Sequence, residues 1–256
     1  MVGGVTQEVL IFDLDGTLVD SLPGIAGSLN RALASLGLPE HSLAAIRGFI
    51  GNGSRILATR AAPIRSDEPL IDRLEQAFKV DYSHTWPAAS PPYAGIGELL
   101  EQLRQLNHPL AVLSNKPHPF TLAMVSAIFP QVPFAAVLGQ RPGIPHKPDP
   151  AGVREIAALL GVTPADCWMI GDSTMDLATA KNSGARAMAV TWGYHDRADL
   201  LATAPDAVID TPAELVEGLR EKSPHFSRCR TAPAGFTLNA PGAAPPTMFP
   251  SHAAIR

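Results

Sequence analysis

The spacing of apolar residues divides the first part of the chain into one strand and several helices. Residues 9–12 (VLIF) form a short apolar run, which predicts a buried strand. In residues 21–36 apolar side chains recur every three or four positions after a serine, which predicts an amphipathic helix with an N-cap. Residues 42–86 continue this helical period around a glycine-rich turn at 48–55, and 87–95 is predicted to be a proline-rich linker.

After the linker, short apolar runs alternate with amphipathic segments of helical length. This alternation is typical of a parallel sheet with helices on both faces. We therefore expect an α/β fold with a Rossmann-like, three-layer core, to which the first strand also belongs. The predicted strands are 109–113, 134–138, 167–170, 186–191 and 206–210, and the predicted helices between them lie near 118–128, 150–161 and 174–183.

The domain organisation follows from the position of the helical stretch, which interrupts the α/β pattern. Residues 1–19 and 91–222 are expected to form the α/β core, and residues 20–90 an inserted helical domain. Residues 223–256 are rich in proline and alanine and have no sustained apolar period. Such a segment cannot bury enough apolar surface to offset its ordering entropy, so we expect it to be disordered.

Composition and charge exclude several classes of protein. The chain has 256 residues, of which 46 % are hydrophobic and 17 % charged, as in a globular protein with an ample core. A formal net charge of −4 is too small to favour nucleic acid or a membrane surface as a partner. The two cysteines, Cys167 and Cys229, do not suggest a disulfide framework. No leader and no membrane span is visible, so a cytoplasmic location is expected.

Polar residues follow the predicted strands where a parallel sheet binds its ligands, beyond the carboxyl ends. Two of them, Asp13 and Asp15, lie so close that their charges repel unless a cation intervenes or one keeps a proton. Carboxylates suit Mg²⁺, while a lysine and hydroxyl or amide donors suit phosphoryl oxygens, so a site for phosphate and a divalent cation is predicted. The residues at this edge are Asp13, Asp15, Ser114, Asn115, Lys147, Asp172, Ser173 and Asp176.

The motifs D-x-D-G-T-L (13–18), S-N (114–115), K-P (147–148) and G-D-S-x-x-D (171–176) occur in this order over residues 9–220. Together they resemble those of the haloacid-dehalogenase-like phosphohydrolases. Within that superfamily, the helical insertion is similar to a small C1-type cap domain. The stretches SNKPHPFT and KPDPAG are most similar to those of phosphoglycolate phosphatases.

The resemblance implies a role for the carboxylates of the motifs. Asp13 would be the nucleophile that forms an aspartyl-phosphate, and Asp15 the acid and base that protonates the leaving oxygen and then activates water. Mg²⁺ would be held by Asp13, the backbone carbonyl of Asp15, and Asp172. Asp176 would either hold the metal shell through water or pair with Lys147, which leaves two arrangements open.

Further residues are expected to bind or support the substrate. Ser114 and Lys147 would hold the phosphoryl group, and Ser173 would support the loop that carries the metal ligands. The remaining candidates for substrate binding are Thr17, Asn115, Arg47 and Asn52, of which the last two flank the glycine-rich turn of the insertion.

These observations predict a Mg²⁺-dependent phosphatase that hydrolyses a small phosphorylated metabolite, with 2-phosphoglycolate as the expected substrate. A β-phosphoglucomutase-like phosphotransferase or a pyrophosphatase would need the same core residues and differ only in cap contacts and water access. A binding protein that has lost the chemistry is a further alternative, which is disfavoured because no motif residue is missing. The protein is expected to be a monomer or a homodimer.

Overall fold

The computed structural model describes residues 8–220, and the segment 223–256 that we expect to be disordered lies outside them. Six strands form one parallel sheet in the order β3-β2-β1-β4-β5-β6, with the first strand of the sequence at the centre. This confirms the predicted α/β fold. The strands are β1 (Val9–Phe12), β2 (Leu110–Pro117), β3 (Ala136–Gln140), β4 (Cys167–Gly171), β5 (Arg186–Val190) and β6 (Ala207–Ile209).

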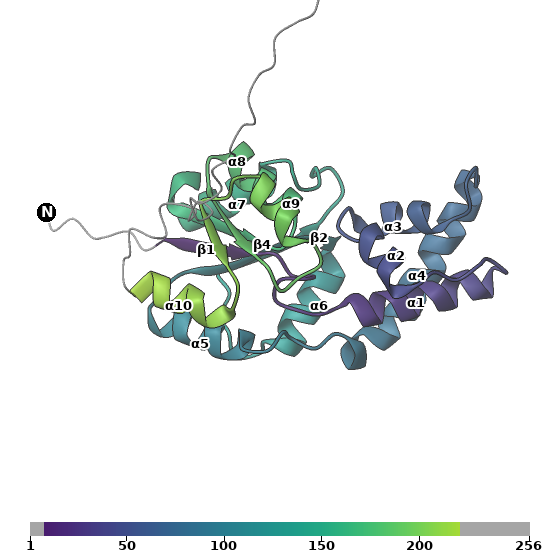
Figure 1. Ribbon diagram of the computed structural model, residues 1–256, viewed down its shortest axis with the longest axis horizontal. Coiled ribbons are helices and arrows are strands. Elements are labelled where there is room, and N and C mark those ends of the chain that lie inside the picture. Colours follow the sequence, from purple (N-terminus) through teal and green to yellow (C-terminus); the bar gives the residue numbers. More distant parts are fainter. Residues whose placement is uncertain (1–7, 221–256) are drawn as a thin grey trace, which may run out of the picture.

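Helices cover both faces of the sheet and give the molecule three layers (Figure 1). Because successive strand residues point to opposite faces, Leu10 and Phe12 of β1 lie in one apolar cluster and Val9 and Ile11 in another. The first cluster contains residues of α5 (Ile96–Gln105), α6 (His118–Ile128) and α10 (Pro212–Arg220). The second contains residues of α7 (Ala151–Leu160), α8 (Thr174–Ser183) and α9 (Arg197–Ala202).

The helical insertion lies beside the sheet, beyond the carboxyl ends of its strands (Figure 1). It consists of α1 (Leu22–Ser35), α2 (Leu43–Phe49), α3 (Gly53–Ala61) and α4 (Glu68–Ala89), with α1 and α4 packed along each other. Its interior is largely apolar, and its buried apolar side chains belong to the same cluster as one face of the sheet. The insertion therefore has no separate core of its own.

Helix α4 runs through Pro87 to Ala89, where the sequence predicts a linker. Proline breaks a helix because it removes a hydrogen bond, but here Tyr82 and Trp86 are buried on one face of the last turns and hold them in place. The pattern analysis also missed the helices α5, α9 and α10, although α5 buries four side chains at helical spacing.

The strand order places the site. Strands β2 and β4 flank β1 on its two sides. The chain leaves β1 into the insertion, and it leaves β4 into α8, which covers one face of the sheet. The strand order therefore runs outward from β1 in both directions, and at such a point a crevice opens at the carboxyl ends of the central strands. Among residues 8–220, no helix is long and apolar enough to cross a membrane.

Candidate active site

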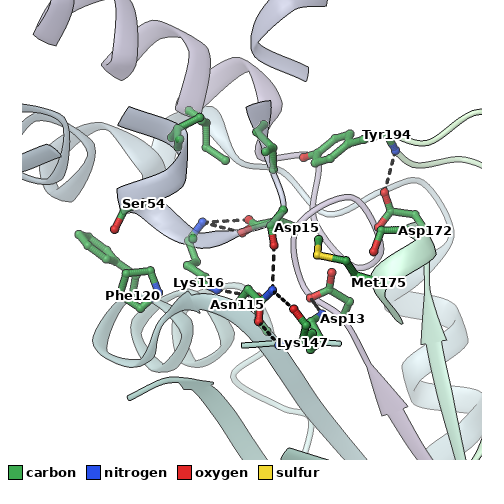
Figure 2. A pocket seen from close by; sticks show the side chains of 18 of the residues that line it. Asp13, Asp15, Ser54, Asn115, Lys116, Phe120, Lys147, Asp172, Met175 and Tyr194 are labelled. Atoms are coloured by element: carbon green, nitrogen blue, oxygen red, sulfur yellow. Dashed lines mark hydrogen bonds and ion pairs between the residues drawn. The ribbon is translucent and has the colours of Figure 1, made fainter. Parts of the chain in front are cut away.

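A pocket lies between the carboxyl edge of the sheet and the helical insertion (Figure 2). Its floor comes from the last residues of β2 and from the segments after β1, β3 and β4, and its opposite wall is largely apolar. The predicted site residues that line it are Asp13, Asp15, Arg47, Ser114, Asn115, Lys147, Asp172 and Ser173. The apolar wall includes Ile25, Ile50, Leu57, Phe78 and Phe120.

Asp13 is fixed at the end of β1. Its backbone N–H donates to the carbonyl of Ile170, which continues the pairing with β4, and its Oδ1 accepts from the N–H of Leu14 at 2.7 Å. The Lys147 Nζ lies 2.9 Å from the same oxygen. Burial raises the pKa of Asp13 to about 7, against the Lys147 charge and with help from the Asp176 and Asp15 charges.

Asp172 is held at the end of β4 by two donors on its carboxylate. The Thr17 hydroxyl donates to Oδ1 at 2.9 Å, and the backbone N–H of Tyr194 donates to Oδ2 at 2.8 Å. Burial raises the pKa of Asp172 to about 8, and the charges of Asp176 and Asp13 add to the effect. Gly193 permits the close approach, because a Cβ there would lie 2.3 Å from the Cβ of Asp172.

Lys147 and Asp176 form a buried ion pair below the pocket. The Lys147 Nζ lies 2.6 Å from Asp176 Oδ1 and donates to the carbonyl of Leu113 at 3.1 Å. The other carboxylate oxygen of Asp176 accepts from the Ser173 N–H and hydroxyl, which caps α8. Burial alone would lower the pKa of Lys147, but the Asp13 and Asp176 charges outweigh it and raise it. Of the two arrangements that we left open for Asp176, the structure shows the pair with Lys147.

The carboxylates of Asp13, Asp172 and Asp176 offer oxygens that all lie within 4.8 Å of one another. Two of these acids have raised pKa values because their negative charges are buried with too little compensation. A divalent cation that prefers oxygen ligands would supply the missing charge. The donor set therefore fits a divalent metal ion, and among the residues that the structure describes it is the one acidic cluster of this kind.

Asp15 has a buried cationic partner that sequence reasoning missed. The Lys116 Nζ lies 2.9 Å from each of its carboxylate oxygens (Figure 2). The Ser21 hydroxyl donates to Oδ1 at 2.5 Å. Ser21 is in turn fixed by Tyr194, whose hydroxyl accepts from the Ser21 N–H at 3.0 Å. Lys116 directly follows the Ser-Asn motif, and this position next to a predicted site was the available signal.

Ser114 and Asn115 lie at the end of β2, where register shifts against β3 between Leu113 and Pro117. Ser114 is buried, and its hydroxyl accepts from the Lys116 N–H at 3.2 Å. The Asn115 side chain donates to the carbonyls of Gly51 and Lys147 and accepts from the Lys147 N–H at 2.7 Å. Asn115 thus joins the insertion to the lysine loop, and its amide is already engaged.

Three predicted substrate contacts have other partners. Thr17 and Asn52 are not among the residues that line the pocket: the Thr17 hydroxyl is bonded to Asp172, and the Asn52 amide points to the sulfur of Met175 at 3.0 Å. Arg47 lines the rim, where its guanidinium donates to the Tyr194 carbonyl and lies 3.4 Å from Asp196. Arg47 therefore connects the insertion with the loop after β5.

Comparison with known proteins agrees with this architecture. The model of the haloacid dehalogenase-like hydrolases matches residues 10–190. The chain is 36 % identical to a phosphoglycolate phosphatase of Mesorhizobium japonicum, over 85 % of this chain and 97 % of the relative. It is 31 % identical to the phosphoglycolate phosphatase of Pectobacterium atrosepticum, over 84 % and 94 % of the two chains.

Solved structures show the same likeness. A crystal structure described as a predicted phosphoglycolate phosphatase from Haemophilus somnus superposes with a TM-score of 0.78 at 30 % identity. The match covers 84 % of this chain and 99 % of the other, so it includes both the sheet and the helical insertion.

Proposed function

The chain belongs to the family of haloacid dehalogenase-like hydrolases, and from this premise we propose that it is a Mg²⁺-dependent phosphatase that hydrolyses 2-phosphoglycolate. The observation that carries the proposal is the convergence of Asp13, Asp172 and Lys147 on the floor of one pocket. The relatives named phosphoglycolate phosphatase support the choice of substrate, and their match extends over most of both chains.

Asp13 is the proposed nucleophile. Its carboxylate oxygen attacks phosphorus, the bond from phosphorus to the ester oxygen breaks, and an aspartyl-phosphate forms on Asp13. Lys147, 2.9 Å from that carboxylate, is placed to offset negative charge on the phosphoryl oxygens, and the Ser114 hydroxyl lies at the same pocket wall. These groups are held by buried contacts, so they need little reorganisation when the substrate arrives.

Asp15 is the proposed acid and base. It gives a proton to the leaving oxygen in the first step, and in the second step it takes a proton from the water that attacks phosphorus. The second attack breaks the bond between phosphorus and Asp13 and releases inorganic phosphate. Asp15 is well placed because Lys116 and Ser21 hold its carboxylate in a fixed orientation.

The metal ion is proposed to be Mg²⁺, held by Asp13, Asp172 and the backbone carbonyl of Asp15. When bound, it would neutralise charge on the phosphoryl group and on the two carboxylates. Asp176 contributes negative charge near the metal ion, but its carboxylate oxygens accept hydrogen bonds from Lys147 and Ser173. We therefore place Asp176 outside the set of metal ligands.

We also propose that residues 20–90 act as a cap that shields the pocket and shapes its leaving-group side. Helices α1–α4 supply the apolar wall, including Ile25, Leu57 and Phe78. The connection to the sheet consists of the segment after Asp15 and the end of α4, where Asp20 pairs its backbone N–H with the Pro91 carbonyl. Exclusion of bulk water by such a cap would strengthen the electrostatic contacts of Lys147 and the metal ion with the phosphoryl group.

The proposal is tested by phosphate release from 2-phosphoglycolate after dialysis against a chelator and readdition of a single metal. We expect no turnover in the metal-free protein, full recovery with Mg²⁺, and little with Ca²⁺, whose looser coordination fits a compact site poorly. The Asp13→Asn variant, which keeps the shape of the side chain, should be inactive in all conditions. Full turnover after chelation would refute the metal requirement. Faster hydrolysis of pyrophosphate, or transfer of the phosphoryl group to a sugar, would refute the substrate.

A further inference from the structure

Lys116 is a buried cation to which the proposed reaction gives no role beyond orienting Asp15. It is 8 % exposed, it lines the pocket, and it stands at the junction between Asp15 and the apolar wall. Its three N–H donors are accounted for by the two carboxylate oxygens of Asp15 and by the Tyr82 hydroxyl at 3.1 Å. Burial alone would lower the pKa of Lys116, but the charge of Asp15 and the contact with Tyr82 raise it, so Lys116 is charged.

We propose that Lys116, supported by the Tyr82 hydroxyl, is a subsite for a negatively charged group that the leaving alcohol carries next to its ester oxygen. The inference rests on the proposed function and deepens it, because it assigns a specificity-determining residue to the phosphatase reaction. The chemical class selected is a phosphomonoester of a 2-hydroxycarboxylate rather than of a neutral alcohol.

The distances support this position. To receive a proton from Asp15, the leaving oxygen must come within about 3 Å of one of its carboxylate oxygens. The Lys116 Nζ lies 2.9 Å from both of them, so it is within about 6 Å of the leaving oxygen. A carboxylate joined to that oxygen through a single carbon atom falls within reach of the ammonium.

Lys116 can release one donor to the substrate without leaving Asp15 unsatisfied. Asp15 Oδ1 accepts from both Lys116 and the Ser21 hydroxyl, and the bond from Ser21 remains when Lys116 turns away from that oxygen. The ammonium also lies 4.7 Å from the centre of the Tyr82 ring, which is stacked on Phe78 and contacts Phe120 edge-on. In a buried surrounding of aromatic rings, opposite charges attract each other more strongly than they do in water.

The other cations that line the pocket are less suited to this role. Lys147 is bonded to Asp13 and Asp176 on the phosphoryl side. Arg47 is bonded to the Tyr194 carbonyl and is partly exposed. Lys79 is also partly exposed and is paired with Glu75 at 2.6 Å. Lys116 is thus the buried cation on the side of the pocket from which the alcohol leaves.

The test compares two substrates of nearly the same shape: 2-phosphoglycolate and its amide, in which a neutral carboxamide replaces the carboxylate and the phosphate is kept. The measured quantity is the ratio of their kcat/KM values, because an effect of Lys116 on Asp15 changes both substrates alike and cancels. We expect wild-type protein to prefer the carboxylate strongly. In Lys116→Met the ratio should fall by about 10²-fold, the scale seen when one partner of a buried charge pair is removed.

Three further variants separate charge recognition from a structural effect. Lys116→Arg keeps the charge and should retain much of the preference, whereas Tyr82→Phe removes only a supporting hydroxyl and should lower the ratio several-fold. Lys79→Met removes a partly exposed lysine of the same pocket that is paired with Glu75, and it should leave the ratio unchanged. If Lys116→Met does not fold, the Arg and Phe variants still decide, since an unchanged ratio in Tyr82→Phe together with a lost preference in Lys116→Arg overturns the inference.

The proposed substrate and the subsite can fail separately. A wild-type ratio near one, or an equal loss on both substrates in Lys116→Met, overturns the subsite while the phosphatase reaction stands. Hydrolysis of 2-phospholactate but not of 2-phosphoglycolate overturns the proposed substrate, and the Lys116 ratio is then measured on 2-phospholactate and its amide. Activity on 4-nitrophenyl phosphate without activity on 2-phosphoglycolate or 2-phospholactate overturns both the proposed substrate and the subsite.

Discussion

Burial of Asp172 predicts that the metal-free protein loses stability as pH rises. The pKa of this carboxyl group is raised from 3.8 to about 8, so between these values the folded protein binds more protons than the unfolded chain. The free energy of unfolding therefore falls with rising pH, from about pH 4 to about pH 8. Below this window the group is protonated in both states and costs nothing, and above it the full cost is present.

The magnitude follows from the shift. One pKa unit corresponds to about 1.4 kcal/mol, so the three units between pH 5 and pH 8 amount to at most about 4 kcal/mol. The matched variant is Asp172→Asn, which has nearly the same shape and carries no charge. Its amide oxygen can keep the bond from the Tyr194 N–H, and the Thr17 hydroxyl can rotate to accept from the new amide. The variant should therefore lack most of this pH dependence.

The assay is urea unfolding of both proteins in chelator at several pH values between 5 and 8.5. We expect the variant to become the more stable protein as pH rises, by about 2–4 kcal/mol at pH 8. With saturating Mg²⁺ the order should reverse, because an ion that binds only the folded state stabilises the wild type and gains little from the amide. Stability curves that run parallel for the two proteins across this range would refute the reasoning.

Two other predictions concern the acid and the cap. With 4-nitrophenyl phosphate, whose leaving group needs little protonation, Asp15→Asn should accumulate phosphate on Asp13, because the second step in this variant loses general base help of about 10²–10⁴-fold. Intact mass spectrometry after an acid quench detects the phosphorylated protein. The absence of the phosphate, or its attachment to another residue, contradicts the assignment. Arg47→Ala should raise KM for 2-phosphoglycolate and for its amide by the same factor, because the Arg47 side chain donates to the Tyr194 carbonyl and is not available to the substrate. If steady-state kinetics show an effect on the carboxylate substrate alone, Arg47 is instead a substrate ligand.

The apolar pattern sufficed to predict the sheet and the edge at which the site lies. Strand β1 is buried on both faces and consists of four consecutive apolar residues, and in a parallel sheet the residues that follow each strand meet at one edge. For this reason Asp13, Asp172 and Ser114 could be placed together before any coordinates. The pattern did not predict the last turn of α4, because burial of Trp86 outweighs the local preference of Pro87.

The contacts around Asp15 could not be found in the same way, because they depend on side chains from separate elements that meet only in the folded protein. Ser21 precedes α1, Tyr82 lies in α4 and Lys116 in β2, and no spacing rule connects them. Within the sequence, Lys116 is marked only by its place after the Ser-Asn motif, and lysines near strand ends are mostly solvated. The burial of Lys116 against Asp15 is what indicates a function, because a buried ammonium needs an anion beside it throughout the reaction. While Asp15 is occupied with the leaving oxygen, a carboxylate on the substrate can supply that anion. The residue that sequence reasoning overlooked is therefore the one that makes the substrate's own charge relevant to selection.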